Sequence, residues 1–199
     1  MRKEFGAKTW VYPMPVMILA AYGEDGKPMA MNAGWVGVAS YENVFVGLAK
    51  HHKTTEYILQ SRAFTLSPAT QAQLVACDYV GVESGSKVPD KMERSGFHTR
   101  PASHVNAPVL EELPMTLECE MVSYDPEQEL LIGRVVNVSA DESILDEKGR
   151  IDADKAAFLT LDPGSLCYRT IGQVTGRAFH DGLALSQKEQ VRPFDDKKE

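Results

Sequence analysis

A short polar and cationic segment carries the clearest chemistry in this sequence: Lys50-His51-His52-Lys53-Thr54-Thr55. It follows an apolar run at residues 44–49 and precedes a helix expected over residues 56–61, so it lies where a strand ends and a helix begins. The free backbone N–H groups and positive dipole end of a helix can converge there, with hydroxyls and a lysine, on an anion such as phosphate. The alternative is that Thr54 or Thr55 caps the helix while the lysines stay solvated.

Two other groups could contribute to binding. Ser84-Gly85-Ser86-Lys87 allows a tight turn with accessible amides, and Lys91 could add charge to the same anion; alternatively, this is an ordinary surface loop. The segment Asn32-Ala33-Gly34-Trp35 places an amide and an indole among small residues. Asn32 could hydrogen-bond the edge of a heterocycle while Trp35 packs against a flat ring. The alternative is that Trp35 is a core residue.

Several familiar catalytic patterns are incomplete. No GxGxxG follows a strand, so a Rossmann nicotinamide site is not supported. Residues 81–87 imitate a P-loop but have three residues between the glycines where four are required. His51 and His52 are adjacent and point in different directions, which is poor geometry for a metal. Each cysteine is expected to be a small core residue rather than a reactive thiolate. We therefore name no catalytic acid, base or nucleophile, and no metal ligand.

The composition limits the class of protein. The chain has 199 residues, of which 43% are hydrophobic and 25% charged, a size that suits one domain. Its net charge of −7 argues against a nucleic-acid partner. The charge is uneven, because residues 1–100 sum to +2 and residues 101–199 to −9, so the candidate cationic cluster lies in the first half. No apolar run approaches the ~20 residues of a membrane span, and three separated cysteines favour a reducing, cytoplasmic setting.

The elements that must position these groups are mostly strands. Hairpin patterns and apolar runs predict strands over residues 16–22, 29–40, 44–49, 63–67, 115–122, 130–138 and 166–174. Helices are expected over residues 56–61 and 71–80, the second capped by Thr70, with a single turn at 90–94. The polar tail, residues 187–199, is expected to fray or form an arm. The pattern predicts one α+β, mainly β domain built as an antiparallel barrel with short peripheral helices.

The motifs also occur in a recognisable order. They are the opening strand PxPVMIL, Met31-Asn32-Ala33-Gly34-Trp35, a hairpin before a Lys/His-Lys-Thr segment, Thr54-x-x-x-Ile58 leading to Phe64, Tyr79-Val80-Gly81-x-x-Ser84-Gly85, Asp90-Lys91 and a late Tyr168. This ordered set resembles the flavin reductase-like family, in particular its flavoredoxin-type members. The similarity covers about residues 10–175 of a single domain spanning 1–199, with residues 176–199 as a C-terminal extension. The resemblance implies an FMN-binding split β-barrel, usually a homodimer with flavin sites near the subunit interface.

The resemblance also implies roles for individual residues. Asn32 and Trp35 would address the isoalloxazine region, and Tyr168 could cover the ring from the late strand. The residues implied at or around the FMN phosphate are Lys53, Thr54 and Lys91, then His52 and Thr55, with Ser84 and Gly85 in the loop that positions Lys91.

Three functions remain open from the sequence. The first is an FMN-dependent oxidoreductase, a flavin reductase that uses NADH, NADPH or a similar donor. The second is an FMN-binding electron carrier that works through a protein partner, to which the acidic second half could contribute. The third is a structural or small-ligand-binding barrel in which the phosphate-like junction is only a helix cap.

Overall fold

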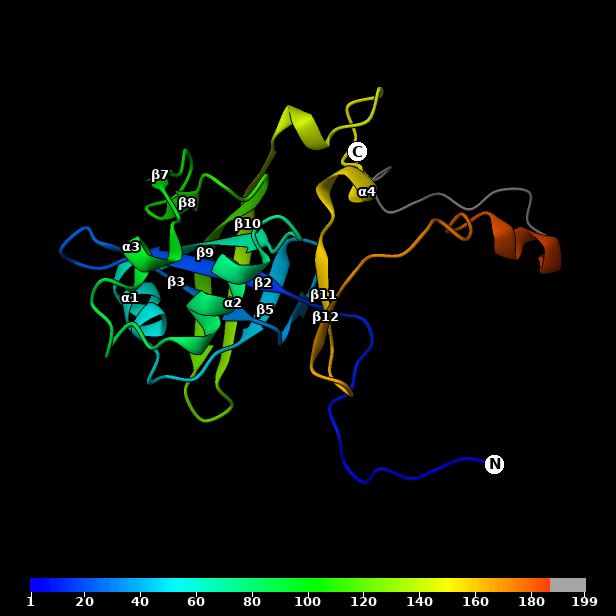
Figure 1. Ribbon diagram of the computed structural model, residues 1–199, viewed down its shortest axis with the longest axis horizontal. Helices are drawn as coiled ribbons and strands as arrows, with labels where there is room; N and C mark the ends of the chain where they lie inside the picture. Colours follow the sequence, from blue (N-terminus) through cyan, green and yellow to red (C-terminus); the bar gives the residue numbers. More distant parts are fainter. Residues whose placement is uncertain (187–199) are drawn as a thin grey trace.

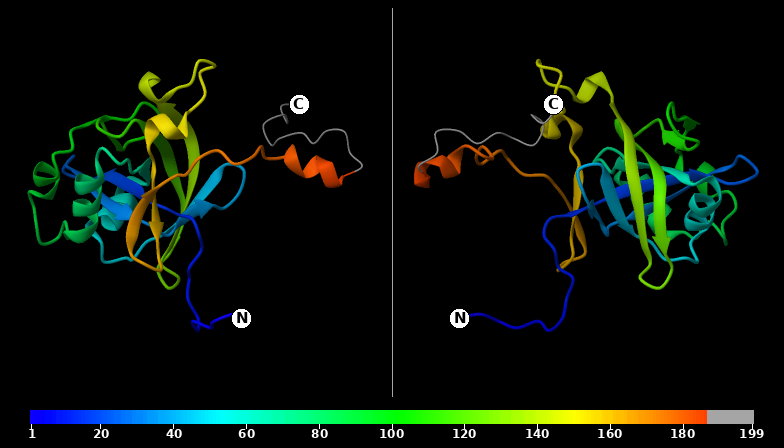
Figure 2. Two further views of the ribbon diagram at one scale, coloured as in Figure 1. Left: turned by 45° about the vertical axis from the view of Figure 1, so that its right-hand side comes forward. Right: turned by 180° about the vertical axis from the view of Figure 1, so that it is seen from behind.

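The polypeptide folds around one strongly curled antiparallel sheet, which Figures 1 and 2 show from three directions. The computed structural model describes residues 1–186 of the chain. The sheet has seven strands in the order β3-β2-β6-β9-β10-β5-β4. Their bounds are β2 (Met17–Tyr22), β3 (Pro28–Ala33), β4 (Val36–Val38), β5 (Asn43–Gly47), β6 (Ala63–Pro68), β9 (Met115–Asp125) and β10 (Leu130–Ala140).

Two strands that follow each other in the sequence, β3 and β4, lie at opposite edges of this sheet. β3 pairs with β2 and β4 pairs with β5, so residues 29–40, expected as one strand, form two. The residues between them, Gly34 and Trp35, therefore connect the two edges of the half-barrel. Asn32 lies near the end of one edge strand and Trp35 just before the other, so both are at the opening of the barrel.

Smaller sheets and short helices complete the fold. A three-stranded sheet has the order β1-β11-β12, and β7 pairs with β8. Their bounds are β1 (Met14–Pro15), β7 (Thr99–Pro101), β8 (Pro108–Leu110), β11 (Leu159–Asp162) and β12 (Cys167–Thr170). The helices are α1 (Lys53–Ser61), α2 (Leu74–Val82), α3 (Lys91–Ser95) and α4 (Ala153–Ala156), with 3-10 turns η1 (Glu142–Ile144) and η2 (Asp181–Leu185). This architecture confirms the predicted split β-barrel.

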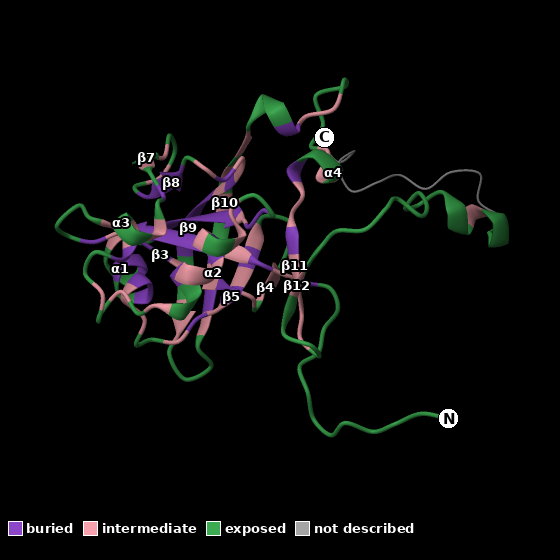
Figure 3. Ribbon diagram, in the orientation of Figure 1, coloured by how far each residue is buried: buried purple, intermediate pink, exposed green. Residues whose placement is uncertain are grey.

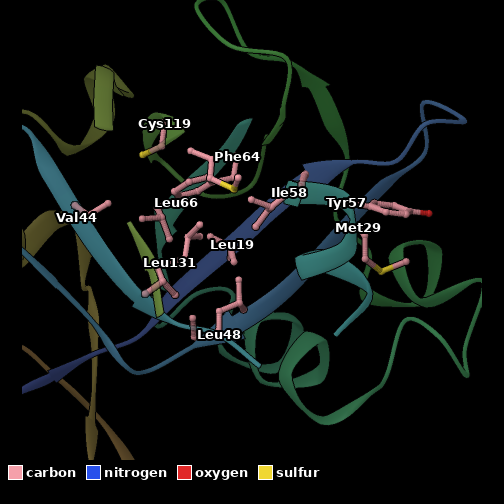
Figure 4. Packing of buried hydrophobic residues seen from close by; sticks show 14 residues of the cluster. Leu19, Met29, Val44, Leu48, Tyr57, Ile58, Phe64, Leu66, Cys119 and Leu131 are labelled. Atoms are coloured by element: carbon pink, nitrogen blue, oxygen red, sulfur yellow. The ribbon is translucent and has the colours of Figure 1, made fainter. Parts of the chain in front are cut away.

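The core fills the concave side of the curled sheet. Figure 4 shows Leu19 of β2, Phe64 and Leu66 of β6 and Leu131 of β10 packed together, with Ile58 of α1 covering them. A second apolar cluster lies between the sheet and α2, which packs against β3. Burial on this scale is the main driving force that holds α1 and α2 on the sheet.

Some element boundaries differ from the sequence pattern. Helix α2 begins at Leu74 rather than at residue 71, because Thr70 forms a β-bridge with Phe158 instead of capping the helix. The last strand covers Cys167–Thr170 only, since its pairing with β11 ends there. The predicted tail at residues 187–199 lies outside the described residues.

The cysteines do not share one environment. Cys77 and Cys119 are buried, and burial raises the pKa of Cys77 to about 11 and that of Cys119 to about 12. Cys167 is exposed, so the expectation of a core position is wrong for it, because β12 is an edge strand of the small sheet. Within residues 1–186, no helix is long and apolar enough to cross a membrane.

Candidate functional site

Helix α1 begins directly after His52, its N-cap residue. His52 has extended backbone angles, but its side chain makes no capping hydrogen bond. The first N–H to bond into the helix is that of Glu56, which donates to the His52 carbonyl. The N–H groups of Lys53, Thr54 and Thr55 have no partner in the described part of the chain. The start of α1 therefore presents free donors and the positive end of the helix dipole.

The two threonines at this helix start differ. Thr55 Oγ1 donates to the carbonyl oxygen of Ala49 at 2.8 Å and ties the helix to the preceding loop. Thr54 is only 2% exposed, yet its hydroxyl has no hydrogen bond with any described residue. Neither hydroxyl accepts a helix N–H, so the expectation that Thr54 or Thr55 caps the helix is wrong. The helix starts earlier, at Lys53, and includes both threonines.

Lys91, the first residue of α3, is also 2% exposed. Its ammonium has no ion pair or hydrogen bond with the described residues. Burial lowers the pKa of Lys91 to about 8, and the nearby charge of Glu83 opposes this effect. The pKa of His52 is also lowered, first by burial, then by His51 and by Lys91. The charge of Lys91 therefore acts at the start of α1, although the two residues belong to different helices.

Neither of these unpartnered polar groups is sealed inside the protein. Among residues 1–186, Tyr79 Oη is the one side-chain nitrogen or oxygen that is fully buried without a partner. The Lys91 ammonium and the Thr54 hydroxyl, which also lack partners, must therefore reach the surface at some point. A buried donor without a partner is stabilised by a ligand that accepts its hydrogen bond, provided that the ligand can reach it. An anion can accept a hydrogen bond from both the Lys91 ammonium and the Thr54 hydroxyl.

The loop after α2 packs against the same helix start. A Cβ atom on Gly85 would lie 2.5 Å from Met29 Sδ and 3.3 Å from Lys53 Cβ, so glycine permits this close approach. Two N–H groups further along the loop donate to the carbonyl of Ser84, which turns the chain toward α3. This loop thus carries Lys91 toward α1.

The ammonium of Lys53 pairs with Glu56 and does not join the free N–H groups at the start of α1. Its Nζ lies 2.9 Å from Glu56 Oε1 and 5.0 Å from the centre of the Tyr57 ring. The hydrogen bond with Glu56 raises the pKa of Lys53. The ammonium is therefore already paired, and the free donor that Lys53 offers at the helix start is its backbone N–H.

An open depression lies beside the start of α1, next to Trp35. Its volume is about 350 Å³, and its lining includes Trp35, Leu48, His52, Gln128 and Glu129. Trp35 is 59% exposed, so the alternative of a core position does not hold. Burial, His51 and Lys91 lower the pKa of His52, which favours its neutral imidazole. An aromatic wall and a neutral ring suit a flat, uncharged ligand part.

Asn32 lies on the other side of the barrel opening and joins β3 to α2. Its Nδ2 donates to the carbonyl oxygen of Cys77 at 3.1 Å. A Cβ atom on Gly81 would lie 2.8 Å from Asn32 Cβ, so the helix touches the strand at this glycine. One donor of the Asn32 amide is thus used to hold α2.

Tyr168 of β12 reaches the same region. Its hydroxyl donates to Asp78 Oδ1 at 2.6 Å, and its side chain packs on the apolar cluster below α2. Burial, followed by the hydrogen bond to Asp78, raises the pKa of Tyr168 to about 12, while a contact with Asn32 opposes the shift. Tyr168 is therefore a neutral phenol held between Asp78 and Asn32.

The sequence-predicted residues thus fall into two neighbouring groups. Around the start of α1 the structure gathers His52, Lys53, Thr54, Thr55, Ser84, Gly85 and Lys91, and around α2 it places Asn32 and Tyr168, with Trp35 at the barrel opening. Sequence reasoning missed Asp78, Gln128 and Glu129. Asp78 is the one charged residue in α2, and a lone carboxylate in an apolar helix is a usable signal. The hairpin-tip residues offered no signal, because only the folded sheet brings them near Trp35.

The curled antiparallel half-barrel is the fold of the flavin reductase-like split barrels. The chain belongs to the flavin reductase-like family: the family's sequence profile, described as "Flavin reductase like domain", matches residues 9–166. The resemblance seen in the motifs is therefore confirmed. Membership of this family supports a flavin as the cofactor.

Two solved structures agree with this assignment, and a curated relative is similar in sequence. Flavoredoxin of Desulfovibrio vulgaris (Miyazaki F) is 32% identical with a TM-score of 0.87, and the match covers 92% of this chain and 100% of that one. Flavoredoxin from Methanosarcina acetivorans is 28% identical with a TM-score of 0.83, covering 93% and 99%. An uncharacterized protein of Pyrococcus abyssi is 27% identical over 68% of this chain and 79% of its own.

Proposed function

We propose that the protein binds FMN, with the phosphate at the start of α1, and transfers electrons through the flavin. The observation that carries this proposal is the Lys91 ammonium, which is 2% exposed and has no described carboxylate partner. A phosphate would supply the missing charge and would also accept from Thr54 and the free N–H groups of the helix. The similarity to two flavoredoxins supports the same ligand.

The flavin ring would lie at the barrel opening, between Asn32 and Trp35, with Tyr168 covering it. Around the phosphate, the supporting positions would be His52, Lys53, Thr55, Ser84 and Gly85. Bound FMN supplies the redox chemistry, and the protein's part is to bind and orient it. No side chain is assigned as a catalytic acid or base.

The FMN site can be tested by comparing two flavins. The purified protein should show flavin absorbance or gain it on addition of FMN. Lys91→Met and Thr54→Val should each weaken FMN binding at least tenfold and change riboflavin binding far less, because riboflavin lacks the phosphate. Lys87→Met, an exposed lysine on the same loop, is the matched control and should bind FMN normally. Absence of any flavin binding, or equal losses for both flavins, would contradict the proposal.

The activity that we infer is that of an oxidoreductase of the flavin reductase type, with NADH or NADPH as a transient donor. The open depression at Trp35 leaves room beside the expected ring position for a second flat molecule. Anaerobic addition of each nicotinamide to the flavin-loaded protein should bleach the flavin absorbance. A protein that keeps its colour with both donors does not have this activity.

A second candidate is an electron carrier that receives electrons from a protein partner. Residues 101–199 carry a net charge of −9, which could steer a basic partner at low salt. Rapid direct oxidation of NADH or NADPH would count against this role. Slow direct oxidation, together with salt-sensitive reduction by a basic redox protein, would favour it.

We also propose that the protein is a cytoplasmic homodimer. The exposed apolar side chains of the terminal segments, such as Val11, Val174 and Leu185, are one reason, because a second subunit would cover apolar surface of this kind. Sedimentation velocity over a range of concentrations tests the dimer directly.

A further inference from the structure

Two terminal segments leave the barrel on the same side and carry apolar side chains into solvent. Figures 1 and 2 show residues 1–13 and the C-terminal arm, residues 172–186, extending away from the three-stranded sheet. Figure 3 shows both as exposed along almost their whole length. In the arm, Val174 is 83% exposed and Leu185 is 98% exposed, and Phe179 adds an aromatic ring. Burying these apolar side chains against another surface would be favourable.

An apolar groove lies at the root of both segments. It is lined by residues of the paired strands β1 and β11, the start of β2 and the end of β6, and has a volume of about 330 Å³. The lining includes Pro13, Pro15, Pro68, Phe158, Thr160 and Ile171. This space is large enough for a leucine or phenylalanine side chain. The groove is therefore an apolar surface on which the apolar side chains of the arm could pack.

We propose that residues 172–186 form an exchanged arm: in a pair of chains, the arm of each copy packs into this apolar groove of the other copy. The direction of the arm supports a second copy as the occupant, because the segment leads away from its own barrel. A segment of this length reaches up to about 50 Å when extended, enough to cross to a neighbouring barrel. Reciprocal exchange also satisfies two-fold symmetry, since each copy gives one arm and offers one groove.

The surface involved is large enough for a stable dimer. Large apolar residues are exposed on the two terminal segments and on the β11–β12 hairpin between them: Trp10, Val11, Tyr12, Leu166, Ile171, Val174, Phe179 and Leu185. If each loses on the order of 100 Å² to the partner, one copy buries about 800 Å², which is the usual share of a specific interface. The inference deepens the proposed homodimer and does not depend on flavin binding.

The arm is tested first by changing its apolar side chains. Val174→Asp with Leu185→Asp should raise the dimer dissociation constant at least 100-fold in sedimentation experiments on the full chain. Gln173→Asp with Thr175→Asp adds the same charge to the same arm but keeps its apolar residues, and should raise the constant far less. Equal effects of the two pairs, or a wild-type chain that stays monomeric, would overturn the proposal. Circular dichroism checks that each variant folds. If the Val174→Asp/Leu185→Asp protein does not fold, Val174→Ser with Leu185→Ser takes its place.

The groove is tested with two threonines of the β11–β12 hairpin. Thr160→Arg places a charged side chain in the groove and should weaken the dimer as strongly as the arm variant does. Thr170→Arg makes the same change at an exposed position of the paired strand, outside the groove lining, and should sediment as the wild type does. A Thr160→Arg protein with unchanged dimerisation would show that the groove is not the docking site.

A mixing experiment distinguishes exchange from an arm that folds back on its own barrel. The Thr160→Arg copy has a working arm, and the Val174→Asp/Leu185→Asp copy has a working groove. If arms are exchanged, a mixture of the two forms mixed dimers with one intact contact, although neither variant dimerises alone. If each arm binds its own groove, the mixture sediments as its separate components do. The experiment is done without flavin, so its failure would leave the FMN proposal standing, and the reverse is also true.

Discussion

The hydroxyl of Tyr168 donates a 2.6 Å hydrogen bond to Asp78 Oδ1 and so joins strand β12 to helix α2 across 90 residues of sequence. This bond links the small sheet to the helix that packs on the edge strand β3. Asn32, on β3, also holds this helix, through the carbonyl oxygen of Cys77. The position of α2 at the barrel opening is therefore set by polar contacts as well as by apolar packing.

Tyr168→Phe should lower the free energy of unfolding by about 1–3 kcal/mol, because a hydrogen bond to a charged, partly buried group is lost. Urea unfolding measures the change. Asp78→Asn keeps an acceptor for the tyrosine and should cost less than Tyr168→Phe. If Tyr168→Phe unfolds as the wild type does, the bond does not hold the helix.

Lys91→Met should make the flavin-free protein more stable at pH 7, by on the order of 1–3 kcal/mol. Burial lowers the pKa of Lys91 to about 8, so the folded state pays a cost to keep it charged. The folded pKa lies below the unfolded one, so this penalty is fully present below pH 8 and fades as the pH rises toward the unfolded value. Lys87→Met should leave the stability nearly unchanged. Unfolding curves at pH 7 and pH 10 test both statements, and an equal gain from Lys91→Met at the two values would contradict this origin.

FMN affinity should fall as the pH rises through about 8, because Lys91 loses its proton there. Bound phosphate favours the charged lysine, so binding near pH 8 should also take up protons. Isothermal titration in buffers of different ionisation enthalpy measures this uptake. The Lys91→Met variant should lack both effects; if it keeps them, another group is responsible.

Thr54→Val and Thr55→Val should affect different properties of the protein: FMN binding in the first and stability in the second. Thr55 donates to the carbonyl of Ala49, so its replacement removes this hydrogen bond and should cost about 1 kcal/mol of stability, while that carbonyl keeps the N–H of His52. The Thr54 hydroxyl has no described partner, so Thr54→Val should change stability little and act on FMN binding. Thermal unfolding and flavin titration of both variants decide this; a stability loss in Thr54→Val equal to that in Thr55→Val would argue against the assignment.

Gly133→Ala should destabilise the barrel by about 1–3 kcal/mol, because an added Cβ would overlap the buried ring of Phe64. Gly172→Ala is the matched control, since its Cβ meets no atom within 4 Å and its backbone is not left-handed. Chemical denaturation compares the two. A wild-type stability for Gly133→Ala would mean that the ring can move aside without loss.

Much of the fold follows from local patterns. Strands at residues 16–22 and 63–67, the turn between the strands that became β4 and β5, and the long hairpin of β9 and β10 were all predicted from alternation and turn residues. The helix caps were predicted wrongly. A threonine before an apolar run suits a cap, but the helix begins earlier, after His52, and the Thr55 hydroxyl donates to the carbonyl of Ala49 in the preceding loop.

The sequence by itself determined the class of protein. Its ordered motifs indicated the family, and its charge distribution allowed an anion site in the first half of the chain. These features are local or additive, so they can be read along a chain. Which groups meet is a different matter, because contacts between distant residues depend on how the sheet curls. The tertiary structure alone decided that β3 and β4 lie at opposite edges, and that Lys91 is buried beside α1 without a described partner.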